Sequence, residues 1–345
     1  MGHQKFMQRA LEIARHGCGN VSPNPMVGCV IVYDNLIIGE GYHRQYGQAH
    51  AEVNAVNSVK DKSLLKKSTM YVTLEPCSHF GKTPPCADWI VQHKIPKVVV
   101  ATLDSNPKVS GKGIEKLRNA GIEVTVGVLE KEAQWLNRRF FTFHEKHRPY
   151  IILKWAQTLD GYMDCNAREE TQRQPYWITN EKLRYEVHRW RSEEDAIFCG
   201  ANTLLNDNPQ LNCRLVGGKN PIRLTFLNKD IDNQGLCFFD NSQPTWIFNT
   251  ECECVNAQTR YVRLQEKDWV ENMLNYLYDN KIQSVIIEGG QKTLNHFLEK
   301  NLWDEIRVLV GNKWFAKGLE APAIKVQPAE VKFFDEDKLL YFYQQ

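Results

Sequence analysis

The sequence predicts an α/β protein that is organised as two successive domains. With 345 residues, the chain is longer than a single domain of about 150 residues. Segments typical of buried strands alternate with segments of helical periodicity along both halves, which is the pattern of layered α/β folds. A polar stretch closed by proline, HEKHRP at 144–149, separates the halves. We therefore expect one domain at residues 1–146 and a second at residues 147–345.

The first domain is expected to begin with a helix and then to alternate strands and helices. Apolar side chains at helical spacing predict a helix over residues 3–17, and the glycines at its end predict its termination. Residues 27–43 have the pattern of two strands around a turn at Asp34–Asn35. Further strands are expected at 68–77, 97–104 and 122–129, and helices at 50–59, 86–95, 113–121 and 130–143.

The alternating pattern restarts after residue 149, which supports a separate second domain. We expect strands at 150–161, 222–228, 284–290 and 303–311, and a strand followed by a loop at 196–209. Helices are expected at 181–195, 270–280 and 291–301.

The bulk composition is that of an ordinary globular protein, with 42% apolar and 24% charged residues. A formal net charge of +2 gives no electrostatic argument for a nucleic-acid or membrane partner. No apolar run approaches the roughly 20 residues that span a bilayer. The N-terminal segment is amphipathic and lacks the apolar core of a signal peptide, so we expect a cytoplasmic protein.

Ten cysteines in a chain without a secretory signal favour metal binding or free thiols over disulfides. Cys252 and Cys254 form the sequence ECEC, but no second pair of Cys or His lies nearby at ligand spacing. We interpret these two residues as free thiols and look for a metal site elsewhere.

Four residues of the first half have the types and order of a catalytic zinc site. His50 and Glu52 stand at the start of one expected helix, and Cys77 and Cys86 flank the start of another. One imidazole and two thiolates leave a fourth position for water, whose pKa zinc would lower to about 7. Glu52 would point away from the metal and transfer a proton to a leaving amine. This order is that of the zinc-dependent base deaminases.

The spacing of the two cysteines carries further information. Eight residues, SHFGKTPP, separate them instead of the two residues of the usual deaminase signature. Lys82 and Thr83 in this insertion suit an anionic group, and we expect a phosphate. His79 is a rival metal ligand, although a residue two positions after Cys77 in a turn would point away from the metal.

Three more polar residues of the first half are candidates for substrate contact. Asn24 lies in the rigid two-proline loop SPNPMVG, where its amide can bind a ring edge. Asp104 and Asn106 follow a buried strand at its carboxyl end, the usual place for a ligand. Either residue could hold ribose or phosphate, and either could equally be a turn former.

The second half contains a weaker nucleotide signal. The fingerprint GxGxxG is absent, but residues 284–294, SVIIEGGQKTL, form a buried strand, two glycines and a helix start. Glycines let backbone amides approach a phosphate, and a helix N-terminus attracts it. Because strand-Gly-Gly-helix connections are common, this segment alone does not identify a nucleotide site.

Taken together, the motifs resemble one enzyme family along nearly the whole chain. The first half contains PNPMVGCVIV, GEGYH, HAEVNAV, YVTLEPCSHFGKTPPC, VVVATLDSNPKVSGKG and LNRRF, and the second contains LKWAQTLDG, WIT, DAIFCGANTLLNDNPQLNCR and IIEGGQKTL. In this order they are similar to the bifunctional riboflavin-biosynthesis deaminase/reductases. The resemblance implies a cytidine-deaminase-like three-layer α/β/α domain followed by an α/β domain like dihydrofolate reductase.

The resemblance also implies two successive reactions in riboflavin biosynthesis. The first domain, with one Zn²⁺ per chain, would deaminate 2,5-diamino-6-(5-phosphoribosylamino)pyrimidin-4(3H)-one. The second, with NADPH, would reduce the ribosyl group of 5-amino-6-(5-phosphoribosylamino)uracil to ribityl. Both substrates are small pyrimidine ribotides, which agrees with the phosphate expected at the insertion. A homo-oligomer is compatible with the family, and the sequence leaves the oligomeric state open.

Site residues carry over from the resemblance by position. His50, Cys77 and Cys86 would bind zinc, Glu52 would be catalytic, and the deaminase pocket would include Asn24, His43, Lys82, Thr83, Asp104 and Asn106. NADPH would contact Ala156, Trp177, Thr203, Asp207, Gly290, Gln291, Lys292, Thr293, Leu294, Asn295 and His296. The reductase substrate would contact Lys154, Arg191, Leu211, Arg214 and Glu288. Lys154 and Asp207 are candidates for proton transfer as the ribose opens.

Departures from the family pattern lie in the second half, where Pro175 stands for a usual serine and Cys199 for a usual valine.

Three alternative interpretations follow from the residues. The chain could be a zinc deaminase of another nucleotide or a tRNA base, its second domain could be inactive or only bind a ligand, or the zinc could be structural. The near-neutral charge argues against a nucleic-acid substrate, and a structural zinc would need a fourth protein ligand.

Overall fold

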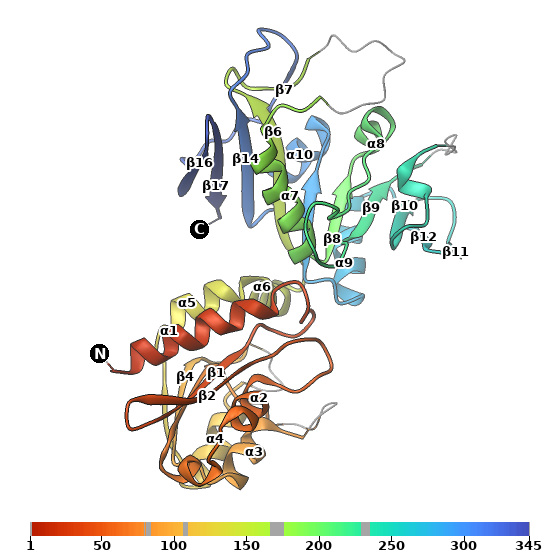
Figure 1. Cartoon of the computed structure of the whole chain (residues 1–345). Helices are drawn as coiled ribbons and strands as arrows, with labels where there is room; N and C mark the ends of the chain where they lie inside the picture. Colours follow the sequence, from red (N-terminus) through yellow and green to blue (C-terminus); the bar gives the residue numbers. More distant parts are fainter. Residues whose placement is uncertain are drawn as a thin grey trace. The chain divides into compact units, whose positions relative to one another are not determined.

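The computed structural model of the protein describes residues 2–78, 80, 84–105, 110–165, 176–228 and 235–344. The chain divides into two compact units, Met1–His147 and Arg148–Gln345, which are red to yellow and yellow-green to blue in Figure 1. Lys82, Thr83 and Asn106, which the sequence predicts as substrate ligands, lie outside the described residues, as do His79 and Pro175.

The first unit contains a five-stranded sheet of order β2-β1-β3-β4-β5. The first three strands pair antiparallel, and β3, β4 and β5 pair parallel. The strands are β1 (Gly28–Tyr33), β2 (Leu36–Tyr42), β3 (Thr69–Leu74), β4 (Lys97–Thr102) and β5 (Glu123–Val126). The helices are α1 (Gly2–Ala14), α2 (Ala51–Ser58), α3 (Cys86–Gln92), α4 (Lys112–Asn119), α5 (Glu130–Leu136) and α6 (Arg138–Lys146), with short 3₁₀ helices at Arg15–Gly17 and Lys62–Lys67.

Alternate side chains of the central strands face two separate cores, so the unit has three layers. Cys29 and Ile31 of β1 pack with α2, α3 and α4, whereas Val30 and Val32 pack with α1 and α5. Successive residues of a strand point to opposite faces, which explains why β1 is apolar without interruption. The α/β/α expectation is confirmed, and Asp34 and Asn35 form the expected turn with φ of 50° and 58°.

The prediction of a single helix at 130–143 is wrong. The structure has two helices, α5 and α6, with Asn137 between them at φ −101° and ψ 23°. The side chain of Asn137 accepts the N–H of Met26 at 2.8 Å and donates to its carbonyl at 2.9 Å. These two bonds tie the break to the Asn24 loop, an interaction that helical periodicity does not reveal.

The second unit is built on a ten-stranded sheet of order β11-β12-β10-β9-β8-β13-β6-β14-β17-β16. All strands from β12 to β14 in the sheet order, namely β12, β10, β9, β8, β13, β6 and β14, are parallel to one another. Antiparallel strands flank this run on both sides. The strands of this sheet are β6 (Tyr150–Thr158), β8 (Ala196–Cys199), β9 (Ile222–Phe226), β10 (Thr245–Asn249), β11 (Cys254–Asn256), β12 (Thr259–Arg263), β13 (Ser284–Glu288), β14 (Glu305–Gly311), β16 (Glu330–Phe334) and β17 (Asp337–Tyr343). Two further strands, β7 (Tyr162–Asp164) and β15 (Leu319–Glu320), pair with each other in a separate two-stranded sheet. The helices are α7 (Glu181–Glu193), α8 (Ala201–Asp207), α9 (Trp269–Asp279) and α10 (Gln291–Glu299), with a 3₁₀ helix at Cys237–Phe239.

Helices cover both faces of this sheet. Ile151 and Leu153 of β6 pack in one core with α9 and α10, and Ile152 packs in another with α7 and α8. The α/β expectation is therefore confirmed for the second unit as well. Among the described residues, no helix has the length and apolarity needed to cross a membrane.

Two expectations for the second unit are wrong. The loop expected after β8 contains α8, whose seven residues are too few to show a clear helical period. Seven strands were not expected, namely β7, β10, β11, β12, β15, β16 and β17. Most are short or exposed, as β11 and β16 are, so their apolar alternation is weak.

Candidate active sites

Three segments of the first unit bring His50, Cys77 and Cys86 together. His50 precedes α2, Cys77 follows β3, and Cys86 is the first residue of α3. Their ligand atoms all lie within 4.8 Å of one another. Among the described residues, this is the one group of His, Cys, Asp and Glu side chains with the geometry of a metal site.

The spacing of these atoms fits zinc. A tetrahedral ion with a Zn–N bond near 2.0 Å and a Zn–S bond near 2.3 Å holds its N and S ligands about 3.5 Å apart. His50 Nδ1 is 3.2 Å from Cys86 Sγ and 3.7 Å from Cys77 Sγ, which brackets that value. The two N–S distances are therefore close to those of a zinc site, and three protein ligands would leave a fourth position for water.

The site favours an ionised sulfur at Cys77, whereas the hydrogen bond with Cys77 and burial raise the pKa of Cys86. Cys77 Sγ accepts the backbone N–H of Cys86 at 3.3 Å. Hydrogen bonds from the Cys86 thiol and backbone, together with His50, lower the pKa of Cys77. Because the thiolate is the form that binds a metal, the protein prepares this ligand before zinc adds its own charge.

Glu52 is a buried acid next to the three ligands. It lies in the first turn of α2 and is 3% exposed. Burial raises its pKa, partly opposed by the charge of His50. A raised pKa makes the carboxylate a stronger base toward a nearby proton donor, which agrees with the role expected from its sequence position.

Asn24 and His43 form a hydrogen-bonded pair beside the ligands. The amide nitrogen of Asn24 lies 3.1 Å from His43 Nε2, and His43 Nδ1 lies 3.1 Å from the Ala49 carbonyl. If Asn24 donates, His43 must be neutral with its proton on Nδ1, and burial accordingly lowers its pKa. The His43 ring also contacts the His50 ring at 5.3 Å between centroids. These contacts hold the Asn24 amide at the metal site.

Glu75 is a further residue of this site, which sequence analysis missed. Its carboxylate is 4% exposed and accepts N–H groups of Gly111 at 2.9 Å and Gly113 at 2.9 Å, with longer bonds from Asp104 and Ile114. Glu75 thus links the Cys77 segment to the segment of Asp104. The sequence did contain a signal, an acidic residue directly after an apolar strand.

We predict that Glu75→Gln destabilises the first unit and weakens substrate binding there. An amide offers one acceptor instead of two and turns an NH₂ group toward N–H donors, which costs about 1–3 kcal/mol. Thermal denaturation should show a lower melting temperature, and deaminase kinetics should show a raised KM. Asp88→Asn, which removes an exposed ion pair with Lys116, is the control and should have little effect. An unchanged melting temperature for Glu75→Gln would contradict this role.

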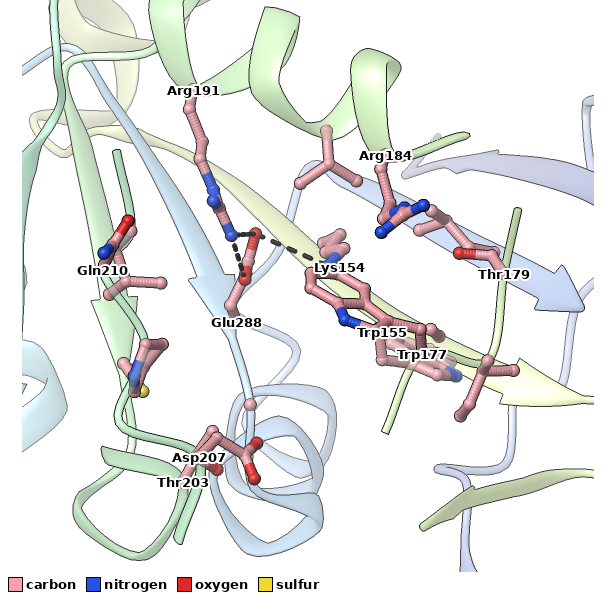
Figure 2. Close-up of a pocket in the computed structure, with 18 of the residues that line it drawn as sticks. Lys154, Trp155, Trp177, Thr179, Arg184, Arg191, Thr203, Asp207, Gln210 and Glu288 are labelled. Atoms are coloured by element: carbon pink, nitrogen blue, oxygen red, sulfur yellow. Dashed lines mark hydrogen bonds and ion pairs between the residues drawn. The ribbon is translucent and has the colours of Figure 1, made fainter. Parts of the chain in front are cut away.

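The second unit contains a cavity of about 460 Å³ at the carboxyl ends of its parallel strands (Figure 2). Four predicted NADPH contacts line it, Ala156, Trp177, Thr203 and Asp207, together with all five predicted substrate contacts, Lys154, Arg191, Leu211, Arg214 and Glu288. The structure therefore brings these predicted contacts, which come from five separate segments of the sequence, together in one cavity. Gly289 also lines it, whereas residues 290–296 do not.

The segment of residues 290–296 forms the start of α10, next to the cavity. Gly289 and Gly290 both have positive φ, 92° and 64°. A Cβ atom on Gly289 would lie 2.9 Å from the side chain of Thr203. The tight turn therefore needs glycine, and it places the N-terminus of α10 directly after the strand that ends in Glu288, as a phosphate cradle requires.

Glu288 is the electrostatic centre of the cavity. It pairs with Lys154 in the neighbouring strand at 3.5 Å and with Arg191 of α7 at 3.2 Å, as the dashed lines of Figure 2 show. Burial alone would raise its pKa, but the two cations outweigh burial and lower it. Burial and the Arg191 charge lower the pKa of Lys154, while Glu288 opposes them. The carboxylate thus holds two cations in a poorly solvated place.

Other cavity residues were not expected from the sequence. They include Trp155, Tyr176, Thr179, Arg184, His188 and Gln210. Arg184 lies over the Trp177 ring at 4.8 Å. On an amphipathic helix, an isolated Arg or His is usually solvated, so periodicity gave no reason to select Arg184 or His188.

We predict that Glu288→Gln destabilises the second unit by about 3–5 kcal/mol, because Lys154 and Arg191 lose their counter-charge. Chemical denaturation at neutral pH measures this loss. Since the folded pKa of Glu288 is lowered, its contribution is present above the unfolded value of about 4.3 and is lost as pH falls through the folded pKa. The difference in the free energy of unfolding between wild type and variant should therefore become smaller at acidic pH. Asp335→Asn, which removes an exposed pair with Lys182, should cost under about 1 kcal/mol. Equal stability of Glu288→Gln and wild type at neutral pH would contradict the assignment.

Each of the two units matches a known protein family. Residues 1–102 match the cytidine and deoxycytidylate deaminase zinc-binding region, and residues 149–322 match the RibD C-terminal domain. The riboflavin biosynthesis protein RibD of Aquifex aeolicus is 39% identical, over 98% of this chain and 98% of its own length. RibD of Bacillus amyloliquefaciens is 40% identical, over 87% and 82%.

A solved structure is similar along the whole chain. It is the diaminohydroxyphosphoribosylaminopyrimidine deaminase/5-amino-6-(5-phosphoribosylamino)uracil reductase of Thermotoga maritima, with a TM-score of 0.89 and 39% identity, covering 99% of this chain and 98% of its own. RibD of Acinetobacter baumannii has a TM-score of 0.87 and 32% identity, with coverage of 99% and 98%. The similarity thus extends over both units and keeps their order.

Proposed function

The chain belongs to the RibD family of riboflavin biosynthesis proteins, and we propose that its two units act in turn on one pyrimidine ribotide. It is a bifunctional enzyme with a zinc-dependent deaminase unit and an NADPH-dependent reductase unit. The proposed first substrate is 2,5-diamino-6-(5-phosphoribosylamino)pyrimidin-4(3H)-one. The proposed second substrate is the deaminated product, 5-amino-6-(5-phosphoribosylamino)uracil. The observation that carries the proposal is the convergence of His50, Cys77 and Cys86 beside buried Glu52.

In the proposed deamination, water replaces the ring 2-amino group and ammonia leaves. When bound by His50, Cys77 and Cys86, zinc supplies the Lewis acidity that makes water nucleophilic near neutral pH. Glu52 accepts a proton from the water and returns one to the departing nitrogen. Its burial supports this role, since burial raises its pKa and makes the carboxylate a better proton acceptor. Asn24, oriented by His43, hydrogen-bonds the polar edge of the pyrimidine.

In the proposed reduction, the ribosyl group of the uracil opens and becomes ribityl. NADPH supplies the hydride, and the residues of the cavity bind and orient the two reactants. Arg191 and Arg214 contribute positive charge for the phosphate of the ribotide. Lys154, whose ammonium is 3.5 Å from Glu288, donates a proton toward the ring oxygen as the ribose opens. Asp207, which lies next to Thr203 and below Glu288 in Figure 2, is the second candidate for proton transfer.

We predict that Glu52→Gln lowers ammonia release by about 10²–10⁴-fold, because the amide cannot carry a proton. Zinc content should be unchanged, since Glu52 is not one of the three ligands. NADPH oxidation with the aminouracil ribotide should also be unchanged, because that reaction belongs to the other unit. Glu12→Gln, an exposed change in the same unit, is the control for amide substitution. Full deaminase turnover by Glu52→Gln would refute the role of Glu52.

A further inference from the structure

One face of α7 presents a row of basic side chains to the reductase cavity. Arg184, His188 and Arg191 are four and three residues apart and all line the cavity, as residues on one side of a helix do. Arg214 joins them from the segment that follows α8. Arg191 and Arg214 are expected substrate contacts, whereas nothing has yet been assigned to His188.

The protein satisfies only part of the hydrogen-bonding capacity of this face, since Arg191 donates to the Asn212 carbonyl and to Glu288. Among the described residues, no partner is found for the buried atoms Arg184 Nε, His188 Nδ1 and Arg191 Nε. His188 is only 3% exposed, so its Nδ1 has little access to bulk water. A buried polar atom without a partner is costly, and three such atoms belong to residues that line one cavity, which favours a polar ligand there.

The charges of the cavity indicate that this ligand is an anion. Lys154, Arg184, Arg191 and Arg214 line it, against the carboxylates of Asp207 and Glu288. Lys154 and Arg191 already pair with Glu288. The positive charge in excess therefore lies on Arg184 and Arg214, near the neutral ring of His188, where a phosphate would find several donors.

We propose that His188 Nδ1 binds a phosphate monoester of the ligand in this cavity and that the ring takes up a proton when the phosphate binds. This inference rests on the proposed reductase function and adds a binding residue to it. The ring donates to a phosphate oxygen through Nδ1, beside the guanidinium groups of Arg191 and Arg214.

The proton uptake follows from the groups that face the ring. Burial, Arg191 on the same helix and Arg214 on the adjoining segment lower the pKa of His188 to about 4, while Glu288 of β13 and the Asn212 carbonyl oppose them. A phosphate dianion would offset the two guanidinium charges. The protonated ring then becomes favourable, and it gives Nδ1 a hydrogen to donate.

A phosphate monoester could come from two sources, the 5-phosphate of the ribotide or the 2′-phosphate of NADPH. The proposal concerns their shared chemistry, and the experiment separates them. One arm compares the ribotide with its dephosphorylated nucleoside as the substrate. The other arm compares NADPH with NADH as the hydride donor.

The test uses two variants of the full-length enzyme. His188→Phe keeps an aromatic ring and removes both nitrogens, whereas His188→Asn keeps an amide donor that cannot change charge. His188→Phe should raise KM by about tenfold or more for the phosphorylated partner and leave KM for its unphosphorylated counterpart unchanged. His188→Asn should recover part of the loss. Ammonia release by the other unit checks that the variants are equally concentrated, and thermal denaturation checks that the second unit of each variant is folded.

Calorimetric binding of ribose 5-phosphate gives a readout that does not depend on turnover. The ratio of wild-type to His188→Asn affinity should increase as pH falls from about 8 to about 6, because protonation of His188 adds to the wild-type complex only. The ionisation of the phosphate itself cancels in this ratio. Its pKa₂ is about 6.

The outcomes are distinct. If wild-type protein oxidises no NADPH with the ribotide but binds ribose 5-phosphate in a His188-dependent manner, the proposed function fails and the phosphate site stands. If KM for phosphorylated and unphosphorylated partners changes equally in His188→Phe, or changes for neither, the role of His188 is overturned. A pH-independent affinity ratio would overturn the proton uptake.

Discussion

Glu75 and Glu288 are carboxylates at the carboxyl ends of buried strands, and each holds the segments of one active site together. A carboxylate in such a place must have its charge compensated, since burial without a partner is strongly unfavourable. Glu75 is compensated by backbone N–H groups of the Asp104–Ile114 segment. Glu288 is compensated by the cations of Lys154 and Arg191. The requirement to satisfy one buried charge thus determines which segments meet at each site.

These two ways of compensating a buried carboxylate suit two kinds of chemistry. Backbone N–H groups are fixed and carry no net charge, so they hold the Glu75 carboxylate without adding a cation beside the zinc ligands. The cations around Glu288 keep an excess of positive charge in the cavity, which suits phosphorylated reactants. Both sites lie where parallel strands end, β3 and β4 in the first unit and β6, β8 and β13 in the second, which is the common location for ligands in such sheets.

Sequence analysis predicted best those features that are encoded by residue type and short spacing. The set His50, Glu52, Cys77 and Cys86 follows from such spacing, and the three-layer order follows from the apolar strands around Val30 and Val100. The role of Glu75 could not be read, because its partners are backbone groups about 36 residues away. The break at Asn137 depends on Met26, 111 residues distant. His188 could not be distinguished from a solvated helix residue until the cavity was known.

The central claim is that two independent sites, one with zinc and one without, work in the same chain. Metal analysis before and after chelation, with both activities measured on the same samples, tests it most directly. The account predicts one zinc per chain, loss of ammonia release on chelation, recovery with added Zn²⁺, and unchanged NADPH oxidation with the aminouracil ribotide. Ammonia release by the metal-free protein, or loss of both activities on chelation, would contradict it.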